Sequence, residues 1–298
     1  FFSSFQALLR RQLPQDQRKH FELERRVTFA LFKEAYENDC NLPDAKKVSS
    51  GLAWHVIRSF IKGHETDDVA PGEYAELPES DKQSVAQRQY ESIYEHVYQW
   101  YCKYLQKNNL WDDQDLVRQV LELNSFETVP VVFCDEAQDF TRLELDFIRR
   151  LSTFSHYDFE LRPTEYLPFA FAGDPLQTLN PTGFRWDPLK ATFHEQLLQN
   201  LPSDSARKRS IRMEELKYNY RSQAPIVHVC NLILAWRKHL FGATLEPQMS
   251  WFAQSSDDAN PPRRFITDGS IEAAKIRRFL EEGRTIIVPC EEGKEREY

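Results

Sequence analysis

The spacing of apolar residues divides the chain into a helical part and a part that mixes strands with helices. Over residues 5–39 and 52–62, apolar side chains recur three or four positions apart, and residues 113–124 begin with an acidic turn. Such spacing predicts amphipathic helices, and acidic side chains favour a helix N-terminus. Residues 1–124 are therefore predicted to form an all-helical block that carries no catalytic motif of its own.

A long helix is expected from Ser80 onward, and its apolar face is rich in aromatic residues. The members of this face share the i, i+3, i+4 spacing of a helix. They are Tyr90, Ile93, Tyr94, Val97, Tyr98, Tyr101 and Tyr104. Such a stripe could act as a platform on which nucleic-acid bases stack. Large aromatic side chains at this spacing more often belong to a core, so we expect the stripe to be buried.

After Pro130 the pattern changes to short apolar runs separated by helical segments. Residues 131–134 and 168–172 are β-branched and aromatic runs that predict strands, and residues 143–151 between them predict a helix. A strand–helix–strand order is typical of α/β folds with a parallel sheet, whose strands are buried on both faces. Ligands of open α/β sheets bind at the carboxyl ends of such strands.

Polar residues stand at the carboxyl end of both predicted strands. Asp135 and Glu136 follow the first strand, and Gly173, Asp174 and Gln177 follow the second. One carboxylate of the acidic pair can hold Mg²⁺, which prefers oxygen ligands, and the other can orient a water that attacks a phosphoryl group. Taken alone, an acidic pair is more often a solvated turn, and the Gly-Asp segment is more often a turn than a site.

A third polar cluster, residues 219–222 with the sequence Asn-Tyr-Arg-Ser, precedes an apolar helix predicted from Pro225 to Trp236. The guanidinium of Arg221 is always charged and can pair with phosphate through two parallel hydrogen bonds. A single arginine is usually solvated. The order of the three clusters along the chain is therefore more informative than any single cluster.

Composition and charge limit the classes of function that this chain can have. The 298 residues are 41% hydrophobic, which is enough for one large domain or two domains with packed cores. The formal net charge of −8 gives no basic footprint over the whole chain, so any contact with nucleic acid must come from a local groove. The five cysteines form no Cys-x-x-Cys pair, which argues against a zinc site and a disulfide framework.

Cysteine usage suits a reducing compartment, so we expect an intracellular location, in the cytoplasm or nucleus. No run approaches the roughly 20 apolar residues of a membrane span, and no membrane partner is expected. The first residues lack the basic region of a signal peptide and do not begin with Met. We therefore expect the chain to start inside a longer protein.

The three clusters, read as longer segments, resemble motifs of a known family. Residues 135–139 (DEAQD), 173–179 (GDPLQTL) and 216–222 (LKYNYRS) are similar to motifs II, III and IV of the UvrD/Rep-like superfamily 1 helicases. The resemblance covers about residues 129–290. Members of this family are two-domain RecA-like ATPases that move along single-stranded DNA.

The resemblance implies an α/β fold, namely a partial RecA-like P-loop NTPase core with a large helical insertion domain. The implied domains are residues 1–124 as the helical insertion, 125–255 as the later part of the first RecA-like domain, and 256–298 as the start of the second.

The resemblance also assigns roles to single residues. Asp135 would hold Mg²⁺ through water, with Glu136 beside it, and Glu136 would activate the attacking water. Gln138 would link the nucleotide to the rest of the core. Gln177 would sense the γ-phosphate of ATP, and Arg221 would reach the same phosphate. All five residues match the motif positions from which these roles are carried over.

Further binding residues follow from the same resemblance. Asp174 and Tyr220 are expected to contact the nucleotide. Phe184, Arg185 and Trp186 stand where the family carries an aromatic-Arg pair whose ring stacks on a base. Here the pair lies two residues further from the motif III glutamine than in bacterial repair helicases. This spacing more closely resembles a eukaryotic branch of large UvrD-like proteins with tetratricopeptide or ankyrin repeats, and so does the segment from Trp54 to Gly63.

The chain also departs from the family pattern. No GxxxxGK[ST] motif occurs in the 298 residues, and the one Gly-Lys pair, Gly293-Lys294, lacks the upstream glycine. A P-loop surrounds phosphates with backbone N–H groups and supplies a lysine, so without it phosphoryl transfer should be severely impaired. Motifs V and VI are also missing. We expect the remainder of the same polypeptide to carry the P-loop and these motifs.

Two functions from different classes remain open at this point. In the first, the chain is part of an ATP- and Mg²⁺-dependent helicase or translocase that acts on single-stranded nucleic acid, with DNA favoured over RNA, and is inactive as a fragment. In the second, it is a degenerate, non-catalytic helicase-like interaction module. A different Mg²⁺-dependent phosphoryl-transfer enzyme is a weaker third idea. Retention of Asp135, Glu136, Gln177 and Arg221 together favours the motor.

Overall fold

The computed structural model places most of the chain, and it divides the chain into two compact units. The described residues are 4–40, 48–64, 68–77, 82, 85–123, 127–152, 169–174, 186, 189, 214–241, 246–251, 278 and 281. The first unit is Phe1–Ile211 and the second is Arg212–Tyr298. The predicted domain boundaries at residues 124/125 and 255/256 stay predictions.

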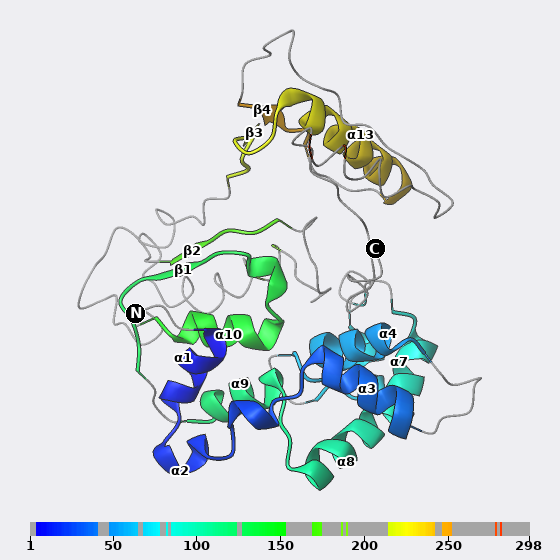
Figure 1. Cartoon of the computed structure of the whole chain (residues 1–298), viewed down its shortest axis with the longest axis vertical. Helices are drawn as coiled ribbons and strands as arrows, with labels where there is room; N and C mark the ends of the chain where they lie inside the picture. Colours follow the sequence, from blue (N-terminus) through cyan, green and yellow to red (C-terminus); the bar gives the residue numbers. More distant parts are fainter. Residues whose placement is uncertain are drawn as a thin grey trace. The chain divides into compact units, whose positions relative to one another are not determined.

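Helices dominate the described part of the first unit (Figure 1). They are α1 (Phe5–Gln12), α2 (Gln15–Arg18), η1 (Leu23–Arg25), α3 (Phe29–Asp39), α4 (Ser50–His55), η3 (Val56–Ile61), α5 (Pro71–Glu76), α7 (Gln87–Ser92), η4 (Ile93–Tyr98), α8 (Gln99–Asn108), α9 (Asp113–Leu121), η5 (Ala137–Asp139) and α10 (Arg142–Arg150). The strands are β1 (Val132–Cys134) and β2 (Phe169–Phe171). The helices predicted before residue 124 are thus present, although they are shorter and more broken than expected.

Most of the aromatic stripe is buried in the first of two hydrophobic cores, as predicted, whereas Tyr94 and Tyr104 are only half-buried at its edge. It runs along α7, η4 and α8, which follow one another without a break from Gln87. Tyr90 and Tyr101 are fully buried, and the ring of Tyr90 stacks on that of Tyr74 at 3.7 Å between centroids. This core also takes residues from α3, α4 and η3. The rings of Tyr90, Tyr98 and Tyr101 pack inside the protein and are therefore not available for stacking with bases.

The second core joins the N-terminal helices to the strand region. Leu9 of α1, Leu116 of α9 and Phe147 of α10 are fully buried in it together with Val132 of β1. Figure 1 shows α1, α9 and α10 gathered beside β1 and β2. Helices from the predicted insertion block therefore share a hydrophobic core with the strand that leads into the acidic pair.

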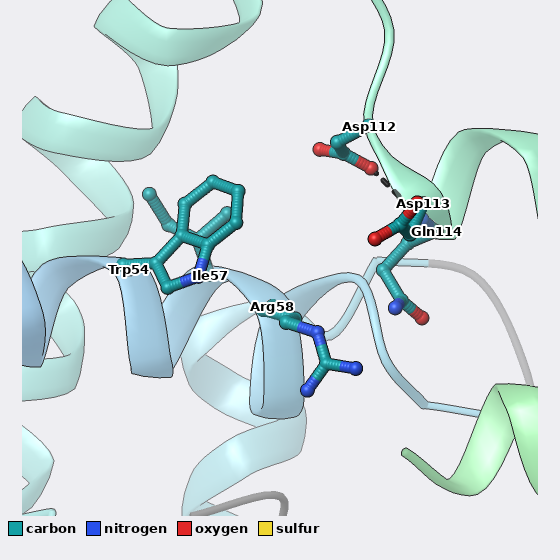
Figure 2. Close-up of a pocket in the computed structure, with 6 residues that line it drawn as sticks. All are labelled: Trp54, Ile57, Arg58, Asp112, Asp113 and Gln114. Atoms are coloured by element: carbon teal, nitrogen blue, oxygen red, sulfur yellow. Dashed lines mark hydrogen bonds between the residues drawn. The ribbon is translucent and has the colours of Figure 1, made fainter. Parts of the chain in front are cut away.

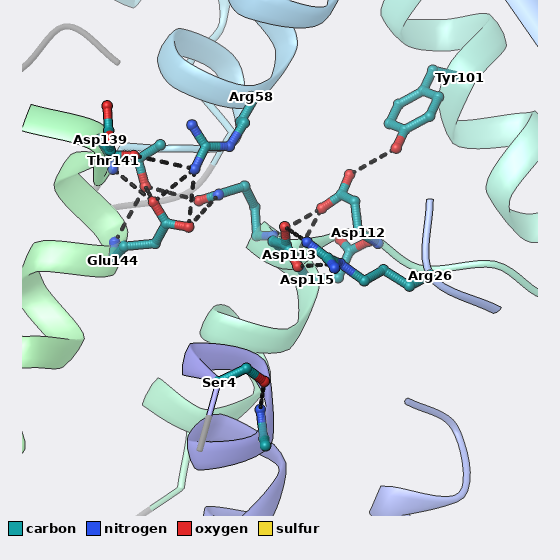
Figure 3. Close-up of polar contacts among 12 residues, drawn as sticks. Ser4, Arg26, Arg58, Tyr101, Asp112, Asp113, Asp115, Asp139, Thr141 and Glu144 are labelled. Atoms are coloured by element: carbon teal, nitrogen blue, oxygen red, sulfur yellow. Dashed lines mark hydrogen bonds and ion pairs between the residues drawn. The ribbon is translucent and has the colours of Figure 1, made fainter. Parts of the chain in front are cut away.

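A buried ionic cluster lies between these two groups of helices. Lys62, which follows η3, is 4% exposed and donates hydrogen bonds to Asp112 at 2.6 Å and Asp115 at 2.5 Å. The hydroxyl of Tyr101 donates to the same Asp112 carboxylate at 3.0 Å (Figure 3). Burial alone would lower the pKa of Lys62, but the two carboxylates raise it above its ordinary value. The cluster ties η3 and α8 to the start of α9.

The two strands described in the first unit are parallel, as predicted, but β1 is not buried on both faces. Val132 pairs with Phe169, and Cys134 pairs with Phe171. Val132 and Cys134 face the second core, whereas Phe133 is 80% exposed and Val131 is 46% exposed. The expectation of a fully buried strand is therefore wrong within the described residues, because only one face of β1 has helices packed on it there.

The described part of the second unit holds one long helix and a short parallel strand pair. Helix α13 (Ala224–Phe241) follows β3 (Tyr218–Asn219), which pairs with β4 (Met249–Ser250). Within residues 256–298, which were predicted to start the second RecA-like domain, the structure describes only Arg278 and Glu281, and both are helical. Across the described segments of the chain, no helix is both long enough and apolar enough to cross a membrane.

Gly63 provides a test of how closely η3 packs against the strand region. A Cβ at this position would lie 2.3 Å from the Arg58 carbonyl oxygen and 3.0 Å from Thr141 Cβ. We expect Gly63→Ala to lower the free energy of unfolding by about 1–3 kcal/mol, because overpacked side chains force the backbone to shift. Urea denaturation measures the change.

Gly51→Ala is the matched control, because a Cβ at Gly51 in α4 would meet nothing within 4 Å. We expect it to be neutral or to stabilise the protein by up to about 1 kcal/mol, since alanine favours a helix. Equal urea midpoints for the two variants would contradict the close packing at Gly63.

Candidate active site

The acidic pair lies where β1 ends and the chain turns sharply. Asp135 and Glu136 are both exposed, and Glu136 has left-handed backbone angles, with φ at 52° and ψ at 41°. The Glu136 amide donates to Asp135 Oδ1 at 2.9 Å. A left-handed conformation is unfavourable for a glutamate. The turn presents the two adjacent carboxylates to solvent at the carboxyl end of the strand.

Gln138 connects the acidic pair to the segment that follows β2. Its carboxamide nitrogen donates to Glu136 Oε2 at 2.6 Å, and its carboxamide oxygen accepts from the Asp174 amide at 2.9 Å. Gln138 is 1% exposed, whereas its partner Glu136 is exposed, so the two hydrogen bonds are partly shielded from water. The structure therefore brings together four predicted site residues: Asp135, Glu136, Gln138 and Asp174.

Gly173 allows this connection because it has no side chain. A Cβ there would lie 2.5 Å from Gln138 Oε1 and 3.2 Å from the Ala137 amide nitrogen. Backbone hydrogen bonds extend the strand pairing to the same point, since Ala172 donates to Cys134 at 2.8 Å and Ala137 donates to Ala172 at 2.9 Å. The missing side chain of Gly173 therefore leaves the space that the Gln138 carboxamide occupies.

The donor set of the acidic pair fits Mg²⁺. Two exposed carboxylates offer hard oxygen ligands, and Mg²⁺ is usually held by one or two carboxylates together with water and phosphate oxygens. No group of three or more His, Cys, Asp or Glu side chains suited to a metal occurs among the described residues. A Mg²⁺ ion held by this acidic pair would thus need further oxygen ligands from the phosphates of a nucleotide. Cys134 beneath the pair is not a competing ligand, because burial raises the pKa of its thiol to about 12.

A second polar network holds the chain just after the acidic pair (Figure 3). Thr141 caps α10, with its hydroxyl accepting from the Glu144 amide at 3.3 Å, while Glu144 Oε2 accepts from the Thr141 amide at 2.7 Å. Arg58 of η3 forms an ion pair with Glu144 at 3.2 Å. None of these residues was predicted to belong to the site. The Thr-x-x-Glu spacing is a capping-box signal that would have located α10, whereas nothing in the sequence points to the Arg58 contact.

A small hollow lies beside this network. It is lined by Trp54, Ile57, Arg58, Asp112, Asp113 and Gln114 (Figure 2). Figure 2 shows the side chains of Arg58 and Gln114 extending from η3 and α9 next to it. Its free space is on the order of one water molecule, so it is not a site for a substrate.

Three predicted site residues, Gln177, Phe184 and Arg185, fall outside the described residues. Trp186 is described, and it is half-buried and packed against the second core. This packing restricts the surface that Trp186 can offer to a base.

Tyr220 and Arg221 belong to the second unit, where they form an ordered turn ahead of α13. The Asn219 carboxamide oxygen accepts from the amides of Arg221 at 3.0 Å and Ser222 at 2.8 Å. Both Tyr220 and Arg221 are exposed, and the Tyr220 ring lies 4.9 Å from that of Trp251. The local turn therefore fixes the backbone of Arg221 and leaves its guanidinium accessible to an anion.

Comparison with known proteins assigns the family. Residues 2–180 match the model of the UvrD/REP helicase N-terminal domain, which is more than half of the chain. No curated protein matches the chain. The matched family implies a RecA-like α/β fold, in agreement with a parallel β1–β2 pair that carries acidic residues at its carboxyl end. The placement in a eukaryotic branch stays a prediction. The chain belongs to the UvrD/REP helicase N-terminal domain family.

Proposed function

We propose that this chain forms part of an ATP-dependent motor that moves along single-stranded nucleic acid, DNA in preference to RNA. The observation that carries the proposal is the exposed Asp135–Glu136 pair, held at the carboxyl end of β1 by the buried Gln138. Family membership supports the same function. The phosphate-binding loop and motifs V and VI would come from elsewhere in the same polypeptide.

Asp135 and Glu136 have separate roles in the proposed reaction. Asp135 would hold Mg²⁺, which when bound neutralises charge on the phosphate oxygens. Glu136 would orient a water in line with the γ-phosphate and accept its proton. The hydrogen bond from Gln138 occupies Glu136 Oε2, so Oε1 is the oxygen that would face the water. This arrangement fixes the carboxylate without covering it.

Gln138 would also couple the position of the Glu136 carboxylate to the position of the segment that follows β2. It contacts Glu136 after β1 and the Asp174 amide after β2, three residues before Gln177. In the proposed site, Gln177 senses the γ-phosphate, Asp174 and Tyr220 contact the nucleotide, and Arg221 neutralises charge that develops in the transition state. An arginine in this role typically accelerates phosphoryl transfer by about 10³–10⁵-fold.

Single-stranded nucleic acid would be held by the segment of Phe184, Arg185 and Trp186. Base stacking on an aromatic ring contributes about 1–3 kcal/mol per base and tolerates any sequence. Because Trp186 packs against the second core, Phe184 is the better candidate for the stacking ring.

A non-catalytic interaction module is the second candidate function. It is favoured by the absence of a GxxxxGK[ST] motif from the 298 residues. ATP hydrolysis by the full-length polypeptide, measured with and without single-stranded DNA, distinguishes the two. Stimulated hydrolysis supports the motor, and a complete lack of nucleotide binding supports the module.

Substitution of Glu136 tests the role of the acidic pair. In the full-length protein, Glu136→Gln should lower kcat for ATP hydrolysis by about 10²–10⁴-fold, because the amide cannot accept the proton of water. ATP binding, measured by titration with a fluorescent analogue, should be retained. Glu127→Gln is the control, since the Glu127 side chain is 72% exposed and lies outside the acidic turn. Wild-type turnover in Glu136→Gln would remove Glu136 from the mechanism.

Substitution of Gln138 tests the connection between the strand ends. Gln138→Glu keeps the shape of the side chain but places a second carboxylate 2.6 Å from Glu136 Oε2. Like charges this close disfavour ionisation of both groups, so the acidic limb of the pH–rate profile should move up by about one pH unit or more. An unchanged profile would show that Gln138 does not act on Glu136.

Two aromatic substitutions separate stacking from packing. Phe184→Ala should weaken binding of single-stranded DNA by about 1–3 kcal/mol and leave ATP hydrolysis without DNA nearly unchanged. Trp186→Ala should mainly lower the melting temperature, because Trp186 packs against the second core. Fluorescence anisotropy with labelled DNA and thermal denaturation measure the two effects. Equal DNA binding by Phe184→Ala and the parent protein would contradict the stacking role.

A further inference from the structure

The end of the acidic turn is held by side chains from the helical block. Arg58 Nη2 donates to both oxygens of the Glu144 carboxylate, at 3.3 and 3.2 Å, and lies 3.5 Å from the Asp139 carbonyl oxygen. The Gln114 carboxamide donates to Glu144 Oε1 at 3.3 Å, and Thr141 Oγ1 lies 2.9 Å from Oε2. Side chains of η3 and α9 therefore converge on Glu144, and Arg58 also reaches the Asp139 carbonyl.

The contact between Arg58 and Glu144 is an ion pair as well as a hydrogen bond. The Glu144 side chain is 3% exposed, and Arg58 is 18% exposed. A buried carboxylate is strongly disfavoured unless a cation and hydrogen-bond donors compensate it. Arg58 supplies that cation from η3, 86 residues earlier in the chain. The position of Glu144, and with it the start of α10, thus depends on the helical block.

The backbone confirms that η3 and α10 are in direct contact. The Gly63 carbonyl accepts from the Leu143 amide at 2.9 Å. Gly63 also lacks the Cβ that would collide with the Arg58 carbonyl oxygen and Thr141. Helix η3 has π-type hydrogen bonding, which is rare and is often found at functional sites.

A short rigid turn connects this contact to the acidic pair. In η5, Asp139 donates to the Glu136 carbonyl at 2.9 Å, and Phe140 donates to the Ala137 carbonyl at 3.3 Å. Glu136 is therefore held from two sides, by Gln138 toward β2 and by Asp139 toward η3. A displacement of the Asp139 backbone would move the Glu136 carboxylate, since only one helical turn separates them.

We propose that Arg58 is a positioning residue for phosphoryl transfer, which holds the end of η5 and thereby fixes the Glu136 carboxylate. Arg58 does not touch the acidic pair, so it acts through Asp139 and Glu144. This inference rests on the proposed function of Glu136. It makes the helical block part of the catalytic geometry.

The test compares Arg58→Met with Arg118→Met in the full-length protein. Arg118 is a matched control, because it is 21% exposed, donates to the Lys62 carbonyl at 2.8 Å and pairs with Asp68 at 3.0 Å. Arg58→Met should lower kcat for ATP hydrolysis by about 10–100-fold, since a small misplacement of a catalytic group has effects of this size. KM for ATP should stay within about twofold, because the change acts on chemistry rather than on uniform binding.

Hydrogen exchange provides a readout that does not depend on hydrolysis. Amides of Ala137, Asp139 and Phe140 should exchange about tenfold faster in Arg58→Met, because their turn opens more easily, and at the parent rate in Arg118→Met. Arg58→Lys keeps a cation and should recover part of kcat and of the protection. An unchanged exchange rate in Arg58→Met overturns the inference, whatever the hydrolysis assay shows.

A double variant separates positioning from stability. Arg58→Met/Glu144→Gln removes both buried charges, and glutamine can still complete the capping box with Thr141. Its melting temperature should recover relative to Arg58→Met, while kcat stays low because η3 no longer holds the turn. Recovery of kcat together with stability overturns the inference. A parent protein that hydrolyses no ATP would instead refute the proposed function, and the exchange comparison would still decide whether Arg58 holds the turn.

Discussion

The buried carboxamide of Gln138 is the interaction on which the site depends. A chain that leaves a parallel strand through a left-handed glutamate has no regular hydrogen-bonding pattern to hold it. Gln138 replaces that pattern, because one amide group binds the Glu136 carboxylate and the backbone at Asp174. Gly173 is required for the same reason, since any side chain there would occupy the position of the Gln138 oxygen. Together with the backbone hydrogen bond from Ala137 to Ala172, this side chain sets the distance between the two strand ends that carry the predicted chemistry.

Buried charges connect this local arrangement to the rest of the first unit. Lys62 with Asp112 and Asp115, and Arg58 with Glu144, place the end of η3 against α9 and α10. Ion pairs that are removed from water contribute little net stability, but losing one partner costs about 3–5 kcal/mol, so they penalise other arrangements. The paired charges therefore help to specify where the helical block sits relative to the acidic turn.

The sequence was sufficient for features that depend on periodicity or on a strand end. The burial of the aromatic stripe, the parallel strands and the clustering of Asp135, Glu136, Gln138 and Asp174 follow from local pattern and from the rule that ligands bind at carboxyl ends of strands. The exposed face of β1 was not predictable, because burial depends on which elements pack there. The Arg58–Glu144 pair was equally hidden, since the two residues are far apart in sequence and each has the ordinary composition of a helix surface.

The cost of the acidic turn bears on whether the chain serves as a motor or as an interaction module. Glu136 has a backbone conformation that disfavours a glutamate by roughly 1–2 kcal/mol, and it exposes a carboxylate directly beside that of Asp135. Asn109, the other described residue with positive φ outside glycine, closes helix α8 and is of a type that tolerates this conformation. No comparable structural benefit follows from a glutamate at position 136, because glycine or asparagine would make the same turn with less strain. The strained turn exposes two adjacent carboxylates, and a buried glutamine and a close glycine contact hold it in place. Such strain is expected where a residue is retained for its chemistry rather than for its contribution to stability.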